Sequence, residues 1–278
     1  EAFLSAELAA RGHEVTLFTS NRMPLWGGAK GIHKRLPLGE SQWRGVRIVR
    51  VPAGPTVSFV PSLPSLPRHL RKRDYDLFLS HEVFSIVAWH TARAARRANA
   101  PFVLVQHGYS AGRRPLLKLL FQLEFQTLGK RVMQAADALV TLTGTGAEFL
   151  DGLGAQSDRV HVIPTGVDCQ LFDPRTLAAG ADTRFGFLGR VERDKGVFLL
   201  LEAFREACAK HATGHQRLVF AGEGDDLEAL RELARAFGLA EQVEFTGRLT
   251  HAQVPGYLAG LDALVAPTLI TEPFGIVA

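Results

Sequence analysis

The chain has 278 residues, of which 46% are hydrophobic and 22% are charged, a composition that excludes wholesale disorder. This length allows two α/β domains, each with a buried core of its own. The net charge of +4 is unevenly spread, because residues 1–177 carry 22 Lys and Arg against 14 Asp and Glu, whereas residues 178–278 carry 10 against 14. A basic first half can attract phosphates, anionic lipid headgroups or nucleic acid, or its charges can simply keep the surface soluble.

The two cysteines, Cys169 and Cys208, lack the spacing of metal ligands or of a redox pair. We therefore expect both cysteines to be small buried residues of a protein in a reducing compartment. No segment resembles a signal peptide, and no apolar run approaches the roughly 18 residues that a membrane span needs, so we expect a cytoplasmic protein. The chain does not begin with Met and opens directly on a helical pattern, which suggests a fragment of a longer protein.

Along the first half, short apolar strands alternate with helices, which predicts parallel sheets covered by helices. Residues 1–11 have helical apolar spacing and end at Gly12, a helix-stop signal. The strands predicted here are Val15–Thr19, Val46–Val51, Leu77–Ser80, Phe102–Gln106, Ala138–Leu142 and Val160–Pro164, and the helices are Phe84–Ala98 and Leu116–Ala136. The segments Asn21–Trp43 and Pro52–Pro67 are rich in Gly or Pro, so we expect long loops there.

A turn-rich segment covers residues 165–174, and a second alternating series follows it. Its predicted strands are Arg184–Leu188, Leu218–Ala221, Val243–Thr246 and Ala263–Ala266, and its predicted helices are Val197–His211, Asp226–Phe237 and His251–Leu258. We place the domain boundary near residue 177, which gives predicted domains of residues 1–177 and 178–278.

A strand-to-helix loop in the second domain carries two cations. The strand ends at Leu188, and Gly189 allows a tight turn. Arg190 and Lys195 then precede a helix that we expect to start at about Gly196. Open α/β sheets bind ligands at the carboxyl ends of their strands, and two fixed cations near a helix N-terminus suit a diphosphate. Taken alone, the two cations could also be solvated surface residues.

The end of the chain carries a carboxylate and a further glycine. Glu272 follows the last predicted strand, and Gly275 is expected to open another helix. A carboxylate at this edge can accept hydrogen bonds from sugar hydroxyls, while the amides of Gly275 and Ile276 can face phosphate oxygens. The alternative is that Glu272 only caps that helix.

The motif G-R-x-x-x-x-K-G at residues 189–196, followed by E-P-F-G at residues 272–275, is a specific pair. With RGHEVTLFTS at 11–20, VIPTGVD at 162–168 and VEFTGRL at 243–249, it resembles the retaining glycosyltransferases of family 4 over essentially the whole chain. The resemblance implies the GT-B architecture, an α/β fold in which two Rossmann-like domains turn parallel sheets toward each other across a cleft. It also implies an N-terminal acceptor-side domain without its first strand and glycine-rich loop, and a C-terminal nucleotide-sugar-binding domain without its C-terminal part. We therefore expect the chain as it stands to bind donor weakly and to be inactive alone.

The resemblance implies roles for matching residues. Arg190 and Lys195 would hold the donor pyrophosphate and stabilise charge on the departing nucleoside diphosphate. Glu272 matches the first glutamate of the family's E-x7-E motif and would contact the donor sugar, while the second would fall two positions beyond Ala278. The implied donor-binding residues are Gly189, Arg190, Lys195, Gly247, Arg248, Glu272, Phe274, Gly275 and Ile276.

His107 follows the predicted strand Phe102–Gln106 at its carboxyl edge. A lone histidine there is more often structural, but in the resembled family a histidine after this strand faces the sugar. We therefore expect His107 to be a sugar-hydroxyl partner or an electrostatic helper. The predicted catalytic residues are then Glu272, His107, Arg190 and Lys195.

The implied reaction retains the anomeric configuration, with a leaving phosphate oxygen helping to deprotonate the acceptor. Catalysis would then rest on positioning and on charge stabilisation by Arg190 and Lys195, without a cofactor or a required metal. The expected partners are a nucleotide sugar as donor and a glycan, a lipid-linked acceptor or a small molecule as acceptor. Basic segments at residues 68–73, 113–118 and 130–131 predict peripheral binding to the cytoplasmic face of an anionic membrane; the alternative is that the helix at 116–128 simply packs on the sheet.

Other classes compete with this interpretation. The segment AGEGDD at residues 221–226 lacks the third glycine of a dinucleotide fingerprint, which argues against an NAD-dependent oxidoreductase. A GT-B sugar-nucleotide epimerase and a non-catalytic nucleotide-sugar-binding module stay open. No aromatic-basic motif supports nucleic-acid binding. UDP, GDP and ADP sugars all fit the motifs, which specify neither the sugar, the acceptor nor the oligomeric state.

Overall fold

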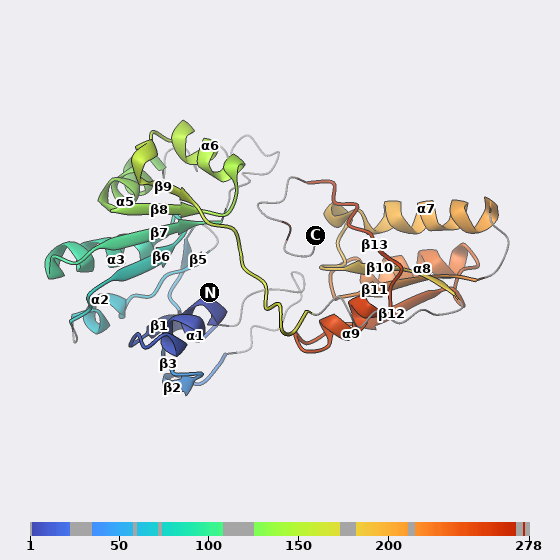
Figure 1. Cartoon of the computed structure of the whole chain (residues 1–278), viewed down its shortest axis with the longest axis horizontal. Helices are drawn as coiled ribbons and strands as arrows, with labels where there is room; N and C mark the ends of the chain where they lie inside the picture. Colours follow the sequence, from blue (N-terminus) through green and yellow to red (C-terminus); the bar gives the residue numbers. More distant parts are fainter. Residues whose placement is uncertain are drawn as a thin grey trace. The chain divides into compact units, whose positions relative to one another are not determined.

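The computed structural model describes residues 2–22, 35–57, 60–71, 74–107, 125–172, 182–210, 215–270 and 275. Within these residues the chain forms two compact units, of which one ends at Pro164 and the other begins at Thr165. Each unit combines helices with a parallel sheet (Figure 1). The boundary predicted near residue 177 falls in a segment outside the described residues.

The main sheet of the first unit has four strands in the order β6-β7-β8-β9, and each pair of adjacent strands is parallel. Its strands are β6 (Phe78–His81), β7 (Phe102–Gln106), β8 (Ala138–Thr141) and β9 (Val160–Val162). The helices of this region are α3 (Ile86–Ala98), η1 (Phe125–Gly129, a π-helical turn), α5 (Lys130–Ala135), α6 (Gly144–Gly152) and η2 (Ser157–Arg159, a 3-10 turn). Of the helix predicted at Leu116–Ala136, residues 116–124 lie outside the described residues.

A second sheet in the same unit has the order β1-β3-β2. Strand β1 (Thr16–Ser20) runs parallel to β3 (Val46–Val51), and β2 (Gly39–Trp43) runs antiparallel to β3. Strand β2 lies in the segment predicted as a loop. No sequence pattern indicated it, because its residues GESQW are mostly exposed and show no apolar alternation. The turn at Arg44 and Gly45, both with positive φ, sets the pairing instead, as expected for a tight hairpin.

Short elements also occupy the proline-rich segment that was predicted as a loop. Strands β4 (Thr56–Val57) and β5 (Val60–Pro61) pair with each other, and helix α2 (Leu66–His69) follows. Helix α1 (Ala2–Ala10) packs near β3. The loop prediction for residues 52–67 was therefore wrong for these short stretches, which are too brief to show a period of their own.

Helix α3 approaches the main sheet closely because its inner face carries small side chains. The buried residues of this helix are Ala88, Thr91, Ala92, Ala94 and Ala95. Its start is capped by Ser85, whose hydroxyl accepts a hydrogen bond from the Val87 amide at 3.1 Å. Its end is set by Asn99, which adopts the left-handed conformation at φ 52°, as helix stops commonly do.

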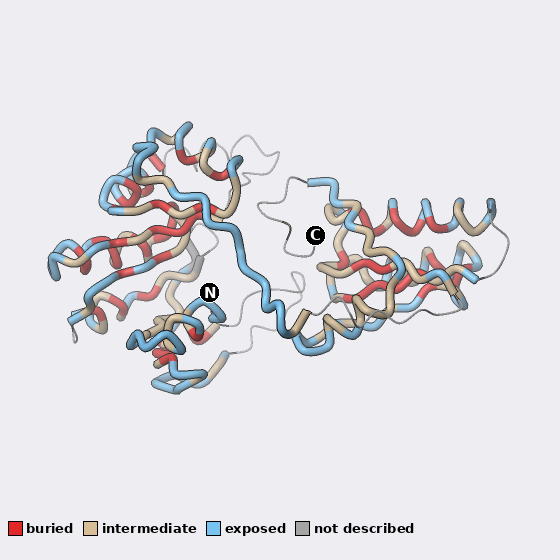
Figure 2. Tube along the Cα trace, viewed as in Figure 1, coloured by how far each residue is buried: buried red, intermediate tan, exposed pale blue. Residues whose placement is uncertain are grey.

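The first-unit core lies between the sheets and these helices, and the buried residues follow the strands and the inner helix faces (Figure 2). Phe102 and Leu104 of β7 are at most 1% exposed. Phe18 of β1 packs against Tyr75, which contacts Phe78 of β6. One core thus supports both sheets of the unit.

The second unit has one parallel sheet in the order β12-β11-β10-β13. Its strands are β10 (Thr183–Leu188), β11 (Gln216–Ala221), β12 (Val243–Gly247) and β13 (Ala263–Leu264), and its helices are η4 (Arg193–Lys195, a 3-10 turn), α7 (Val197–Lys210), α8 (Leu227–Ala236) and α9 (Val254–Ala259). The chain builds outward from β10 to β12 and then returns to pair β13 on the other side of β10. The carboxyl end of β10 is therefore the topological switch point, where open α/β sheets bind ligands.

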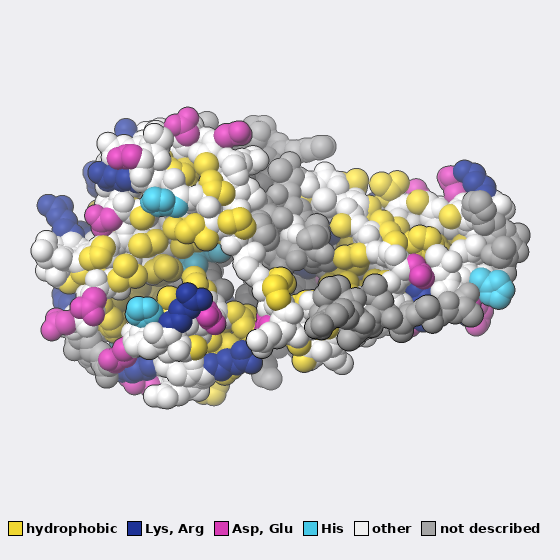
Figure 3. All heavy atoms as spheres, viewed as in Figure 1, with side chains coloured by type: hydrophobic (Ala, Val, Ile, Leu, Met, Phe, Trp, Pro, Cys, Tyr) yellow, Lys and Arg dark blue, Asp and Glu magenta, His cyan; other side chains and the backbone are white. Residues whose placement is uncertain are grey.

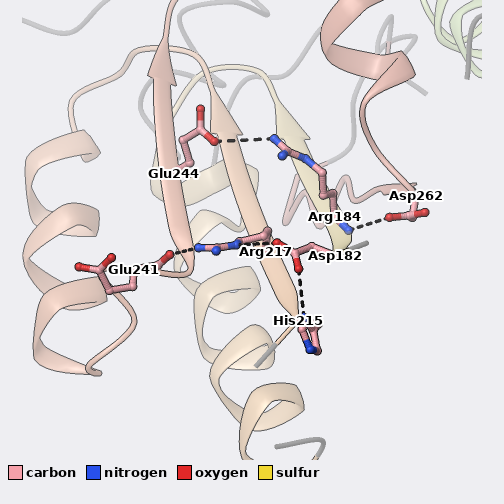
Figure 4. Close-up of polar contacts among 7 residues, drawn as sticks. All are labelled: Asp182, Arg184, His215, Arg217, Glu241, Glu244 and Asp262. Atoms are coloured by element: carbon pink, nitrogen blue, oxygen red, sulfur yellow. Dashed lines mark hydrogen bonds and ion pairs between the residues drawn. The ribbon is translucent and has the colours of Figure 1, made fainter. Parts of the chain in front are cut away.

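The opposite, amino edge of this sheet is joined by a polar cluster (Figure 4). Asp182 accepts a hydrogen bond from Arg217 Nε at 3.1 Å and contacts His215 Nδ1 at 3.2 Å. The hydrogen bonds from Arg217 and then from His215 lower the pKa of Asp182. Because the pKa is lowered on folding, the cluster stabilises the fold above the usual carboxyl pKa of about 3.9, and this contribution is lost as the pH falls through the lowered value.

The two cysteines differ in their exposure. Cys169 is exposed and Cys208 is half-buried, so the expectation of a buried Cys169 was wrong, while burial raises the pKa of the Cys208 thiol. None of the helices among the described residues is both long and apolar enough to cross a membrane.

Candidate functional site

Three neighbouring strands of the second unit each end at a glycine. Gly189 follows β10, Gly222 follows β11 and Gly247 ends β12, and all three have positive φ. The Gly189 amide donates to the Ala221 carbonyl at 3.0 Å, and the Gly222 amide donates to the Gly247 carbonyl at 2.8 Å. A Cβ atom on Gly222 would lie 1.8 Å from the Gly189 carbonyl oxygen. The strand ends are therefore packed backbone against backbone.

The loop after β10 is anchored to the loop after β11. Val191 is fully buried, its amide donates to the Glu223 carbonyl at 3.0 Å, and its carbonyl accepts from the Asp226 amide at 3.2 Å. Asp226 in turn accepts a hydrogen bond from the Arg193 amide at 2.7 Å. These contacts fix the backbone on both sides of the motif that carries Arg190 and Lys195.

Two acidic side chains of the same loop hold Arg190. Its guanidinium forms an ion pair with Glu192 and approaches Asp194 Oδ2 at 3.9 Å. The Arg190 side chain is still 38% exposed. An arginine fork that pairs with carboxylates matches phosphate oxygens equally well, so a diphosphate can compete with Glu192 and Asp194 for it.

The loop after β13 packs directly against the turn at Lys195 and Gly196. The Leu269 amide donates to the Asp194 carbonyl at 2.8 Å. Gly196 adopts φ 72°, and a Cβ atom there would lie 2.0 Å from the Pro267 carbonyl oxygen. The two loops that flank the switch point are thus in contact.

Helix α7 begins at Val197, where the predicted helix Val197–His211 also begins. A 3-10 turn occupies Arg193–Lys195, Gly196 is left-handed, and α7 starts at Val197. The Gly196 carbonyl accepts from the Leu200 amide at 2.9 Å. Lys195 therefore lies on the turn that leads into α7 rather than within the helix.

The predicted donor-binding residues are placed unequally. Gly189, Arg190 and Lys195 share the loop after β10, while Gly247 and the exposed Arg248 lie two strands away, at the end of β12. Gly275 has φ 68°, so it is not itself a helical residue. The predicted residues Glu272, Phe274 and Ile276 lie outside the described residues.

His107 lies at the carboxyl edge of the first-unit sheet, next to a histidine that sequence reasoning missed. Its Nε2 atom is 2.8 Å from Nδ1 of His81, the last residue of β6. The amide side chain of Gln106, the residue before His107, donates to Glu82 Oε2 at 2.7 Å and accepts from the Val83 amide at 2.9 Å. The available signal was a polar pair after each of two apolar strands, His81-Glu82 and Gln106-His107.

No cluster of three or more His, Cys, Asp and Glu side chains suited to a metal ion occurs in the part of the chain that the structure describes. At the carboxyl edge of the second-unit sheet the structure places Arg190 with the carboxylates of Glu192 and Asp194. At the carboxyl edge of the first-unit sheet it places two imidazoles and the carboxylate of Glu82.

Two families match the sequence, Glycosyltransferase Family 4 over residues 2–171 and Glycosyl transferases group 1 over residues 171–278. The chain is 28% identical to a D-inositol 3-phosphate glycosyltransferase of Xylanimonas cellulosilytica, over 99% of this chain and 70% of that protein. It is 30% identical to D-inositol 3-phosphate glycosyltransferase 1 of Catenulispora acidiphila, over 97% of this chain and 68% of that protein. The fold is similar to that of Anabaena HepE in complex with UDP-glucose, with a TM-score of 0.67 and 18% identity over 95% of this chain and 77% of that one.

The order of these matches follows the order of the two units, and the second match covers the glycine-rich strand ends and the loop with Arg190 and Lys195. The first match covers the edge with His81 and His107. The chain belongs to glycosyltransferase family 4 and has the GT-B fold.

Proposed function

We propose that this protein transfers a hexose from a nucleoside-diphosphate sugar to an acceptor hydroxyl, with retention of the anomeric configuration. The observation that carries the proposal is the loop at residues 189–196, which sets two cations at the switch point of a parallel sheet. Ligands of open α/β sheets bind at this point, and cations next to backbone amides suit a pyrophosphate.

In this proposal, Arg190 exchanges its carboxylate partners for pyrophosphate oxygens, and Lys195 adds a second positive charge. Both charges oppose the negative charge that grows on the departing nucleoside diphosphate. Because these cations take the place of a divalent ion, the reaction needs no metal. Glu272 accepts hydrogen bonds from the donor sugar, Gly247 and Arg248 border the nucleobase, and His107 binds a sugar hydroxyl.

The similar proteins suggest which substrates to try first. HepE has been solved with UDP-glucose, and the curated relatives named above are called D-inositol 3-phosphate glycosyltransferases. A relative from Agrobacterium fabrum, 26% identical over 84% of this chain, is called mannosylfructose-phosphate synthase. We propose a UDP-hexose as donor and a small polyol or sugar phosphate as acceptor, ahead of a glycan or a lipid-linked acceptor.

The test is an assay of the protein at its full natural length with UDP-, GDP- and ADP-hexoses, each with and without these acceptors, in the presence of EDTA. We expect nucleoside diphosphate to be released in step with a new glycoside whose anomeric configuration, read by proton NMR, matches that of the donor. Donor binding in calorimetry without any product would instead support a non-catalytic binding module. Conversion of the sugar nucleotide without a glycoside would support an epimerase.

We further propose that the first unit binds peripherally to an anionic membrane surface. Arg68 and Arg71 by α2, and Lys130 and Arg131 of α5, are exposed, whereas residues 72–73 and 113–118 lie outside the described residues. On the face drawn in Figure 3, Lys and Arg side chains lie among Asp and Glu rather than in one continuous patch. The attraction is therefore expected to be modest, at about 1 kcal/mol per cation near the surface.

Sedimentation with neutral and anionic liposomes at low and high salt measures this attraction. We expect binding only to anionic liposomes at low salt, and reduced binding when either Lys130 or Arg131 is changed to Glu. Arg235 of α8 is also exposed, so Arg235→Glu is the matched control with a charge reversal in the second unit. Binding that is insensitive to salt, or no binding at all, would remove the membrane proposal.

A further inference from the structure

The sheet register brings His81 and His107 together. In the parallel pair β6 and β7, His81 is the register partner of Val105. Partners in a sheet share a face, and so do residues two apart along a strand. His107, two residues beyond Val105, therefore emerges on the face of His81. The two imidazole rings are nearly parallel, at 12°, with centroids 5.0 Å apart.

A contact of 2.8 Å between Nδ1 of His81 and Nε2 of His107 is a hydrogen bond, and it requires one proton between the two nitrogens. One ring donates and the other accepts. If each nitrogen carried its own proton, two donors would face each other and the bond would be lost. The tautomer of His107 therefore depends on the tautomer of His81.

The surrounding groups hold the two strand ends in place. Gln106 is 1% exposed and joins the Val83 amide to the Glu82 carboxylate. Glu82 adopts φ 66°, a conformation that is uncommon for a residue with a side chain and that clusters at functional sites. The polar network thus fixes the turn between β6 and α3 on which His81 depends.

Other titratable groups bear on the pair from the neighbouring elements. Glu82 supplies a carboxylate from the turn after β6. His161 of β9 is the register partner of Val140, which is the partner of Val105. It therefore shares the face of His81 but lies three strand spacings away, about 15 Å. His161 is exposed, which makes it a matched reference for the effect of losing an imidazole from this face.

We propose that His81 is a positioning residue for His107. By sharing a proton with Nε2 of His107, it fixes the tautomer and the ring orientation that His107 presents at the carboxyl edge. This inference rests on the proposed function, in which His107 binds a sugar hydroxyl. A neutral imidazole carries its proton on only one ring nitrogen. The hydrogen-bond partner of one nitrogen usually decides whether the other nitrogen donates or accepts.

The experiment compares His81→Phe, His81→Asn and the control His161→Asn. Phe keeps the ring volume but removes the hydrogen bond, whereas the Asn amide can reach the position of Nδ1 without titrating. Long-range proton–nitrogen NMR of the 278-residue chain reads the tautomer of His107 directly. We expect one tautomer in the native chain and in His161→Asn, and a mixture of tautomers in His81→Phe.

The kinetic arm uses the protein at its full natural length. We expect His81→Phe to lower kcat about 10-fold, the low end of the range seen when the hydrogen-bond partner of a metal-bound ligand is removed, with the donor KM nearly unchanged. His81→Asn should recover most of the loss. An unchanged His107 tautomer in His81→Phe, or equal loss in both variants together with reduced thermal stability, would overturn the proposal. Should the native protein transfer no sugar, the proposed function fails, and the NMR arm still decides whether His81 sets the state of His107.

Discussion

Arg190→Ala and Lys195→Ala are each expected to lower kcat by about 10²-fold or more, in the range found when one electrostatic donor to a transition state is removed. The reason is that both cations lie on the loop at the switch point, where the leaving pyrophosphate would accumulate charge. Folding should be unaffected, because Arg190 is 38% exposed and its ion pairs are local. Steady-state rates, with circular dichroism of each variant, provide the measurement.

Arg193→Ala is the matched control for this experiment. Arg193 belongs to the same 3-10 turn as Lys195 and carries the same charge. Its guanidinium, however, lies 4.5 Å from the centroid of the Phe198 ring. We expect its loss to change kcat by less than about threefold, because no part of the proposed pyrophosphate site depends on it. Rates for Arg190→Ala and Lys195→Ala that stay within the same threefold range would contradict the pyrophosphate assignment.

The second large effect is expected at Gly196, where a side chain has no room. Gly196 has φ 72° and Gly238 has φ 71°, so an added methyl group costs about 1–2 kcal/mol of backbone strain at either position. Of these two glycines, only Gly196 would bring its Cβ atom against a backbone carbonyl, that of Pro267 at 2.0 Å. Overpacking adds about 1–3 kcal/mol, which gives a total of about 2–5 kcal/mol for Gly196→Ala.

Urea denaturation measures the free energy of unfolding of both variants. Gly238 follows α8, and among the described residues no atom lies within 4 Å of the place that its Cβ atom would take, so Gly238→Ala should cost only the strain. Gly196→Ala should also weaken donor binding, because relief of the clash separates the two loops at the switch point. Equal losses of stability in the two variants would show that the Pro267 contact yields easily and that strain alone decides the cost.

Much of the fold followed from apolar runs bounded by turn residues. Strands β3 and β7 were predicted with the bounds that the structure shows, because a run of buried β-branched and aromatic residues is a strong local signal. Strand β2 was missed because GESQW is polar and shows no apolar alternation, although all of it pairs with β3. Helix α6 was missed as well; it contains Gly144 and Gly146, and its start depends on the Thr143 hydroxyl, which accepts from the Gly146 amide at 3.1 Å.

The candidate site was predictable only as far as it is local. Arg190 and Lys195 stand close together in sequence, so their loop could be identified from its motif. His81 and His107 are separated by 26 residues, and only the register of β6 against β7 brings them together. The contact of Gly196 with Pro267 likewise depends on the return of the chain to β13. Pairings of this kind are set by tertiary structure and leave no periodic trace in the sequence.

The parallel direction of β10 to β13 separates two tasks along the length of the same strands. The carboxyl ends carry the glycines and the cationic loop, while the amino ends carry Asp182 with Arg217 and His215. Substitutions that retune ligand preference can therefore accumulate in the loops at one end without disturbing the ionic ties at the other. Ligand specificity can therefore change through loop substitutions while the contacts that stabilise the sheet stay the same.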